Sequence, residues 1–111
     1  IEIKAMSHIT GGGIPENLPR CIPNDFVPCI YKNSWDIPFV FRFLQDIGKI
    51  PENDLWNTFN LGIGFCLIIN PKYKDPLIKI CDSQNMPSWE IGKVKKRGNS
   101  ANNLIIKDLI I

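Results

Sequence analysis

The sequence predicts an α+β domain in which helices pack against a mixed β-sheet. Short apolar segments typical of strands alternate with segments whose apolar residues recur every three or four positions, as in amphipathic helices. The chain has 111 residues, of which 44% are hydrophobic and 22% are charged. This length suffices for one hydrophobic core but not for two. We therefore expect residues 1–111 to form a single domain.

The first third of the chain predicts a strand, a glycine turn and a short helix. Residues 3–9 form the expected strand, which runs into Gly11-Gly12-Gly13. Pro15 suits the first turn of the following helix, where a missing N–H costs nothing, whereas Pro19 should keep this helix short or irregular. Residues 25–31 predict the next strand. Because Pro28 cannot donate a hydrogen bond, we expect that strand at a sheet edge, or Pro28 at a strand entry.

Two amphipathic helices are expected in the middle of the chain. Asp36 is positioned to cap the first, which runs from Pro38 to Ile47, and Gly48 is positioned to end it. The second begins at Pro51-Glu52. The apolar faces predicted to be buried in the core consist of Val40, Phe41, Leu44 and Ile47 in the first helix, and Leu55, Trp56 and Phe59 in the second.

The last third predicts three further elements. Residues 62–69 are the clearest strand, and their uninterrupted apolar run predicts that both faces are covered. A helix over 75–84 should bury Leu77, Ile78 and Cys81, and a strand over 88–95 should carry Trp89 and Ile91 on one face, with a bulge at Gly92. The basic run 93–97 is interpreted as a solvated turn. Residues 104–111 are expected to return as a final strand.

The composition excludes several classes of function. A formal net charge of +2 is too small to indicate nucleic acid or an acidic membrane as a partner. The four cysteines form no C-x-x-C pair and the chain has a single histidine, so we expect no metal site. Cys66 lies in an apolar run and is interpreted as a small core residue. The longest apolar run is too short to span a bilayer, and nothing suggests secretion, so we expect a cytoplasmic protein.

The triple glycine is the first candidate site. Backbone N–H groups at Gly11, Gly12 and Gly13, at the start of a helix, suit a phosphate. The neighbouring His8 and Thr10 supply an imidazole and a hydroxyl. The alternative is a tight turn whose glycines supply positive φ, with Thr10 only capping it. His8 is a candidate catalytic residue that moves a proton or binds phosphate; the alternative is a buried, hydrogen-bonded structural histidine.

Two further segments supply candidate binding residues. Asn17 and Arg20 are about one helical turn apart, so both are expected to face the glycine loop. Arg20 is suited to bidentate phosphate binding. The alternative interpretation is that Arg20 forms a surface ion pair with Glu16. Asn60, with Gly62 and Gly64 close behind it, forms a second glycine-bearing approach, for a ligand or for close packing.

Four blocks of sequence resemble one known family. They are AMSHITGGGIPENLPR at 5–20, SWDIP at 34–38 with the residues that follow, TFNLGIG at 58–64, and IGKV at 91–94. In this order they resemble the C-terminal domain of the aminoimidazole ribonucleotide synthetases, also called phosphoribosylformylglycinamidine cyclo-ligases. The resemblance covers about residues 3 to 95. Residues beyond Val94 have no counterpart that we place.

The resemblance implies a fold, a reaction and partners. It implies an α+β domain that contributes the substrate and phosphate wall of an ATP-dependent ligase of purine biosynthesis, which closes the imidazole ring of formylglycinamidine ribonucleotide. ATP and magnesium are then expected mostly on an N-terminal domain that is absent from this sequence, with none held by this chain alone. The implied partners are that N-terminal domain, the ribonucleotide substrate and a second copy in a homodimer. We expect the isolated chain to be inactive, because its carboxylates are scattered and offer no magnesium site.

Other functions remain open at this stage. The chain suits a non-catalytic phosphate-binding or interaction module of the same fold, or a truncated product without activity. The resemblance also extends to related ATP-dependent enzymes, namely thiamine monophosphate kinases, selenophosphate synthetases and formylglycinamidine ribonucleotide synthetases.

Overall fold

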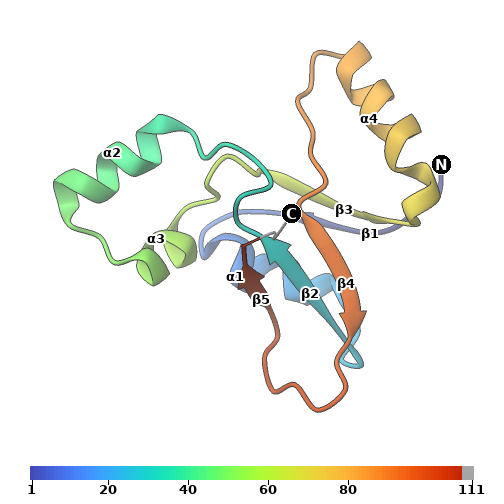
Figure 1. The fold of residues 1–111 in the computed structure, drawn as a ribbon, viewed down its shortest axis with the longest axis horizontal. Helices are drawn as coiled ribbons and strands as arrows, with labels where there is room; N and C mark the ends of the chain where they lie inside the picture. Colours follow the sequence, from blue (N-terminus) through green and yellow to red (C-terminus); the bar gives the residue numbers. More distant parts are fainter. Residues whose placement is uncertain (109–111) are drawn as a thin grey trace.

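The computed structural model describes residues 1–108, which form two small β-sheets with helices around them (Figure 1). The predicted α+β class is confirmed, but the strands do not join into the single mixed sheet that we expected. The elements in chain order are β1 (Ile3–His8), α1 (Gly13–Asn17), the 3₁₀ helix η1 (Leu18–Cys21), β2 (Phe26–Tyr31), α2 (Phe39–Gly48), α3 (Glu52–Thr58), β3 (Phe65–Ile69), the 3₁₀ helix η2 (Pro71–Tyr73), α4 (Lys74–Ser83), β4 (Gly92–Lys96) and β5 (Ile105–Lys107).

The two sheets differ in topology. β1 and β3 form a two-stranded antiparallel ribbon in which His8 lies opposite Phe65 and Ser7 lies opposite Cys66. The other sheet has the order β4-β2-β5, with β2 antiparallel to β4 and parallel to β5. The sheets share a hydrophobic core that is built largely from the segments between the strands. Its buried members are Ile9, Ile14, Leu18, Ile30, Trp35, Leu55, Trp56, Leu61, Ile63 and Cys66.

The prediction that the strand containing Pro28 lies at a sheet edge was wrong, because β2 is the central strand. Tyr31 donates its N–H to the Ile91 carbonyl, and the Asp25 carbonyl accepts from the Arg97 N–H. In an antiparallel pair the residues that bond the partner strand alternate, so Pro28 is turned away from β4. On its other side the parallel pairing with β5 begins only at Cys29. Pro28 therefore occupies the central strand without removing a ladder hydrogen bond.

The helix α2 departs most from its prediction. Asp36 does not cap it; the helix follows Pro38, and Lys49 ends it in the left-handed region with φ 51°. Phe41 packs against the core as expected. Its other predicted core residues are exposed, namely Val40, Leu44 and Ile47. The reason is positional: α2 and α3 extend to one side of the two sheets, where the described chain provides nothing to cover the outer side of α2 (Figure 1).

The remaining predicted elements exist, with smaller corrections. The helix α3 buries Leu55 and Trp56 as expected. The strand β3 is not covered on both faces, since Phe65 is exposed. Lys93 to Lys96 lie in β4 rather than in a solvated turn. Gly92 marks no bulge; it pairs in register with Ile30, and a Cβ there would overlap the Cys29 carbonyl oxygen.

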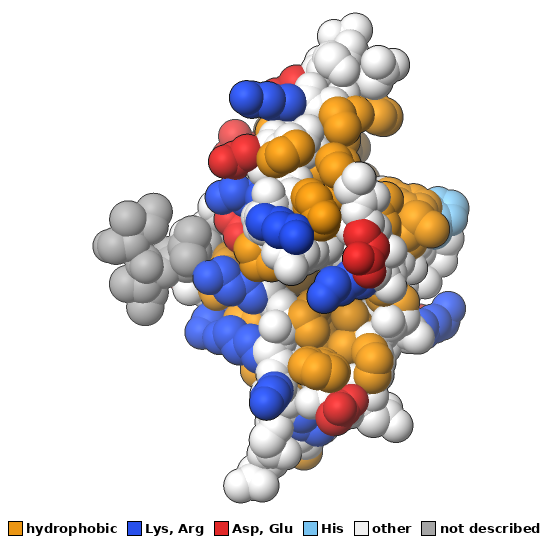
Figure 2. Space-filling model, turned by 90° about the vertical axis from the view of Figure 1, so that its right-hand side faces the viewer, with side chains coloured by type: hydrophobic (Ala, Val, Ile, Leu, Met, Phe, Trp, Pro, Cys, Tyr) orange, Lys and Arg blue, Asp and Glu red, His pale blue; other side chains and the backbone are white. Residues whose placement is uncertain are grey.

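The helix α4 and the chain around it form an exposed, mixed surface. Leu77, Ile78 and Cys81 are half-buried rather than fully buried, and Trp89 is exposed. Figure 2, which views the side of the molecule that carries α4, shows hydrophobic side chains open to solvent with charged side chains between them. The predicted last strand is confirmed only as β5, and residues 109–111 of that prediction lie outside the described residues.

Candidate functional site

The candidate site is a hollow of about 260 Å³ beside the glycine turn, which we call the glycine-loop hollow. Thr10 and Gly11 line it from the turn after β1, Thr58 lines it from the last position of α3, and Asn60 from the segment that follows. The structure thus brings together three predicted site residues that lie up to 50 positions apart, Thr10, Gly11 and Asn60. Its apolar lining consists of Ile9, Phe41 and Phe59.

The apolar wall of the hollow is fixed by contacts between helices. The rings of Phe41 and Phe59 lie 5.5 Å apart, centroid to centroid. The two tryptophans behind them, Trp35 and Trp56, meet edge to face at 5.8 Å, and the Trp35 indole donates to the Leu61 carbonyl at 3.0 Å. This packing holds the α3 end of the hollow against the core.

Asn17 lies beneath the glycine turn and fixes its shape. Its side-chain Nδ2 donates to the carbonyl of Gly13 at 2.7 Å, with longer contacts to the carbonyls of Thr10 at 3.2 Å and Gly11 at 3.3 Å. Its Oδ1 accepts from the Thr10 hydroxyl at 3.1 Å. Because the residue is only 4% exposed, the prediction that Asn17 faces a ligand is corrected: its amide is used inside the protein.

The three glycines have different roles. Gly12 and Gly13 both take positive φ, at 95° and 66°, which a residue with a side chain adopts only with strain. Gly13 is buried, and a Cβ there would overlap the backbone carbonyl oxygen of Trp56. The Gly13 N–H donates to the Thr10 carbonyl at 3.1 Å, so it is not turned to a ligand as predicted. Gly11 is exposed and lies at the hollow.

His8 does not fit the structural alternative of a buried, hydrogen-bonded histidine. It is exposed at the end of β1, where its ring stacks on Phe65 with 6.1 Å between centroids. Successive side chains of a strand point to opposite faces, so His8 points away from the buried Ile9 that follows it. The residue lies one step along the chain from the hollow but not among the residues that line it.

Arg20 is separated from the glycine-loop hollow. It is exposed on η1 and belongs to a second hollow, of about 210 Å³. Asn17 does face the glycine loop, through the bonds of its amide to the carbonyls of Thr10, Gly11 and Gly13, whereas Arg20 lines the other hollow. The ion pair with Glu16 is not found among the described residues either.

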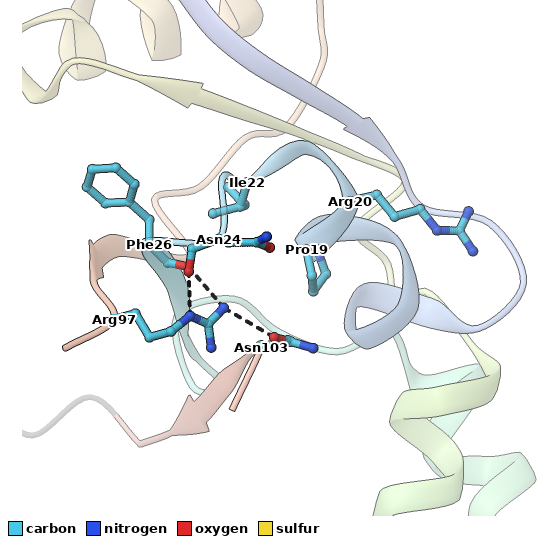
Figure 3. Close-up of a pocket in the computed structure, with 7 residues that line it drawn as sticks. All are labelled: Pro19, Arg20, Ile22, Asn24, Phe26, Arg97 and Asn103. Carbon is cyan, nitrogen blue, oxygen red and sulfur yellow. Dashed lines mark hydrogen bonds between the residues drawn. The ribbon is translucent and has the colours of Figure 1, made fainter. Parts of the chain in front are cut away.

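Arg97 dominates the second hollow, and the sequence analysis missed its role. Its Nε donates to the Asn24 carbonyl at 2.6 Å, and its two Nη atoms donate to the Asn102 carbonyl at 2.5 Å and to Asn103 Oδ1 at 3.1 Å. Figure 3 shows Arg97 and Asn103 turned toward one another, whereas the guanidinium of Arg20 points away from them. Because its donors are occupied by the protein, Arg97 joins β2, β4 and the segment before β5 and is poorly placed to bind an anion.

Asn60 shapes its own turn at the hollow. Its Oδ1 accepts from the Gly62 N–H at 2.8 Å, and the intervening Leu61 takes φ 57°. The predicted close approach is confirmed at Gly62, where a Cβ would meet the ring of Pro38, but nothing lies within 4 Å of a Cβ built on Gly64. The Asn60 Nδ2 is the part of this side chain that remains for a ligand.

The carboxylates of the described residues do not assemble a metal site. Residues 1–108 contain no group of three or more His, Cys, Asp or Glu side chains close enough to hold a metal ion. Glu52 is instead tied to Arg42, Gln45 and Trp56. Hydrogen bonds from Arg42 and Gln45 lower the pKa of Glu52 to about 2.

The cysteines differ in burial. All four are free thiols, and Cys66 is buried in the core as predicted. Burial, with a smaller contribution from Cys21, raises the pKa of the Cys66 thiol to about 11. Such a thiol stays protonated at neutral pH and is a poor nucleophile.

The described residues thus form an α+β domain in which a glycine turn lies beside a small hollow with both polar and apolar lining. Comparison with protein-family models gives the particular family: residues 1–103 match the AIR synthase related protein, C-terminal domain, and the chain belongs to this family. The match extends beyond Val94, where the sequence analysis placed no counterpart. Within residues 1–108, no helix is long and apolar enough to cross a membrane.

Several similar curated proteins carry the same name. The chain is 60% identical over all 111 residues to the phosphoribosylformylglycinamidine cyclo-ligase of Prochlorococcus marinus subsp. pastoris, and covers 32% of that protein. It is 59% identical over 110 residues, 99% of this chain, to the protein of the same name from P. marinus strain MIT 9215, again covering 32% of that protein. A Synechococcus protein of this name is 51% identical over 102 residues, 90% of this chain and 30% of the relative. The chain thus spans about a third of the length of these relatives.

Proposed function

We propose that this chain is the C-terminal, substrate-binding part of an ATP-dependent cyclo-ligase that closes the imidazole ring of formylglycinamidine ribonucleotide in purine biosynthesis. The observation that carries the proposal is the 60% identity over the whole chain to a protein named phosphoribosylformylglycinamidine cyclo-ligase. The meeting of Thr10, Gly11 and Asn60 in the glycine-loop hollow supports a role in holding substrate.

In this proposal the hollow binds a polar, phosphorylated substrate. The Gly11 backbone N–H and the Asn60 Nδ2 supply donors of the kind that phosphate and amide oxygens accept. The Thr10 hydroxyl donates its hydrogen to Asn17 Oδ1 and therefore offers substrate an acceptor. Gly12, Gly13 and Asn17 act indirectly, by holding the turn in one conformation before substrate arrives. Preorganised donors of this kind raise affinity because less order must be imposed on binding.

His8 and Arg20 have conditional roles in the proposal. Both are exposed and outside the hollow, so each acts on substrate only if the rest of the enzyme brings substrate to it. His8 is the candidate for proton transfer, and Arg20 for binding phosphate from the η1 side. We assign ATP and magnesium to the N-terminal domain of the enzyme, in keeping with the lack of any cluster of three or more potential ligands among the described residues. We further propose a cytoplasmic homodimer.

The test uses a chimera in which this chain replaces the matching third of the P. marinus relative. We expect ATP-dependent ring closure by the chimera and none by residues 1–111 alone. The variant Asn60→Ala should raise KM for the ribonucleotide with kcat little changed, and Arg20→Ala should do the same if it binds phosphate. The variant His8→Ala should lower kcat if His8 moves a proton. Magnesium-dependent ATP hydrolysis by the isolated chain would refute this division of roles.

The second candidate is a phosphate-binding module without catalytic activity. The absence of a carboxylate cluster from the described residues favours it for the chain on its own. A chimera that folds and binds the ribonucleotide but does not turn it over would support this candidate over the first.

A further inference from the structure

The helix α2 presents an apolar side to solvent along its whole length. The residues of this side, which we call the α2 face, are Phe39, Val40, Phe43, Leu44 and Ile47, and all five are exposed. Phe39 is 78% exposed, and its ring stacks on Phe43 with 5.8 Å between centroids. The spacing of the five residues places them on one continuous stripe of the helix.

The opposite side of α2 is fixed by contacts within the chain. Arg42 Nη1 donates to Glu52 Oε2 at 2.9 Å and to Gln45 Oε1 at 2.8 Å. Gln45 Nε2 donates to the same Glu52 oxygen at 2.9 Å and to the Ile50 carbonyl at 3.2 Å. Together with Phe41, which packs against the core, these contacts set the rotation of α2 about its axis. The polar side of the helix faces α3, and its apolar side is therefore turned outward.

This orientation is the reverse of that expected for a helix of an isolated domain, which buries its apolar side. An exposed, rigidly presented apolar stripe marks a surface that another chain segment covers. This inference rests on the proposed function, which makes the chain part of an enzyme about three times its length. We propose that the α2 face docks the remainder of the same polypeptide, through an apolar surface of that remainder.

The size of the face favours this occupant over a second copy. A helix of ten residues is about 15 Å long, and one side of it falls well short of the ~800 Å² per partner of a stable interface between separate proteins. A covalently joined partner has a high effective concentration, so a small apolar contact suffices to hold it. The contacts between Arg42, Gln45 and Glu52 strengthen such a contact further, because they hold the α2 face in one orientation.

The experiment measures the accessibility of the α2 face in the full-length chimera by hydroxyl-radical footprinting. We expect Phe39 and Phe43 to be oxidised at least about fivefold more slowly in the folded chimera than in the same chimera unfolded in urea. We expect this protection to be the same at two protein concentrations tenfold apart. Oxidation at the unfolded rate would show a bare face and overturn the proposal. Protection that appears only at the higher concentration would identify a second copy as the occupant and overturn it equally.

Variants provide an independent measurement with a matched control. Phe39→Ser combined with Phe43→Ser should lower the Tm of the chimera, whereas Ile80→Ser on α4, an exposed apolar residue on a helix of the same length, should change it less. An equal effect of the two would contradict docking at α2. A chimera that fails to fold, although the P. marinus relative folds, would also count against it. A protected α2 face in a chimera without ring-closing activity would refute only the proposed function.

Discussion

The amide of Asn17 provides the sharpest test of how the glycine turn is held. The variant Asn17→Ala removes the donor to the buried Gly13 carbonyl and the two longer contacts to Thr10 and Gly11. A buried polar group left without a partner costs about 1–3 kcal/mol. The carbonyls of Thr10 and Gly11 are partly open, so water replaces the amide there. We therefore expect a loss of about 2 kcal/mol in the free energy of unfolding.

Two further variants separate the hydrogen bonds from the side-chain volume. Asn17→Asp keeps an acceptor for the Thr10 hydroxyl but turns a carboxylate toward carbonyl oxygens, so it should destabilise the chain more than Asn17→Ala. Asn57→Ala, which removes an exposed amide on α3, is the control and should change stability by less than about 0.5 kcal/mol.

Equilibrium urea unfolding, followed by the fluorescence of the buried Trp35 and Trp56, measures these differences. The reasoning fails if Asn17→Ala is as stable as the Asn57→Ala control. It also fails if Asn17→Asp is as stable as the unmodified chain, because the amide donor would then be unnecessary.

Three further predictions follow from the described contacts. Gly13 has positive φ and lies against the Trp56 carbonyl, so Gly13→Ala should lower the free energy of unfolding in urea by about 3 kcal/mol or more. Gly11→Ala should be nearly neutral, because nothing lies within 4 Å of a Cβ at that position, and equal losses of stability in the two variants would contradict this reasoning. The Glu52 pKa of about 2 is below that of the unfolded chain, so the contribution of Glu52 to stability should be complete above about pH 4.5 and should disappear as the pH falls toward 2. Because the ion pair with Arg42 is exposed, Glu52→Gln should cost at most ~1 kcal/mol at pH 7. The same variant should weaken the dependence of stability on pH between about 4.5 and 2. The Cys66 pKa of about 11 is above that of the unfolded chain, so this thiol should lower stability as the pH rises from about 9 to 11. In the native chain the buried Cys66 should react with a maleimide far more slowly than Cys81, and unfolding in urea should abolish this difference in rate.

The local sequence determined the kinds and the order of the elements. The apolar period of three to four residues predicted α2 and α3, and an uninterrupted apolar run predicted β3, because these patterns depend on neighbours along the chain. The triple glycine predicted a turn, and Gly12 and Gly13 do take positive φ. The sequence also indicated the family, because its motifs lie in family order.

The candidate site was predictable only in part. Thr10 and Gly11 came from one motif and Asn60 from another, and the packing of the glycine turn against the segment after α3 brought the two motifs together. Asn17 lies inside the turn rather than at a ligand, because the hydrogen-bond acceptors it needed were the carbonyls of the turn itself. No local pattern distinguishes a polar side chain that satisfies buried backbone from one that faces a ligand.

Only the tertiary structure decided which sides of the elements are buried. The central position of Pro28 depends on where β5 begins to pair, 77 positions away at Ile105, and the role of Arg97 depends on carbonyls from Asn24 and Asn102. The apolar side of α2 was predicted to be buried in the core, and this was wrong for all its members except Phe41, because the bonds from Arg42 and Gln45 to Glu52 turn that side outward. Periodicity along a chain determines that one side of a helix is apolar, whereas the direction in which that side faces depends on contacts between distant segments.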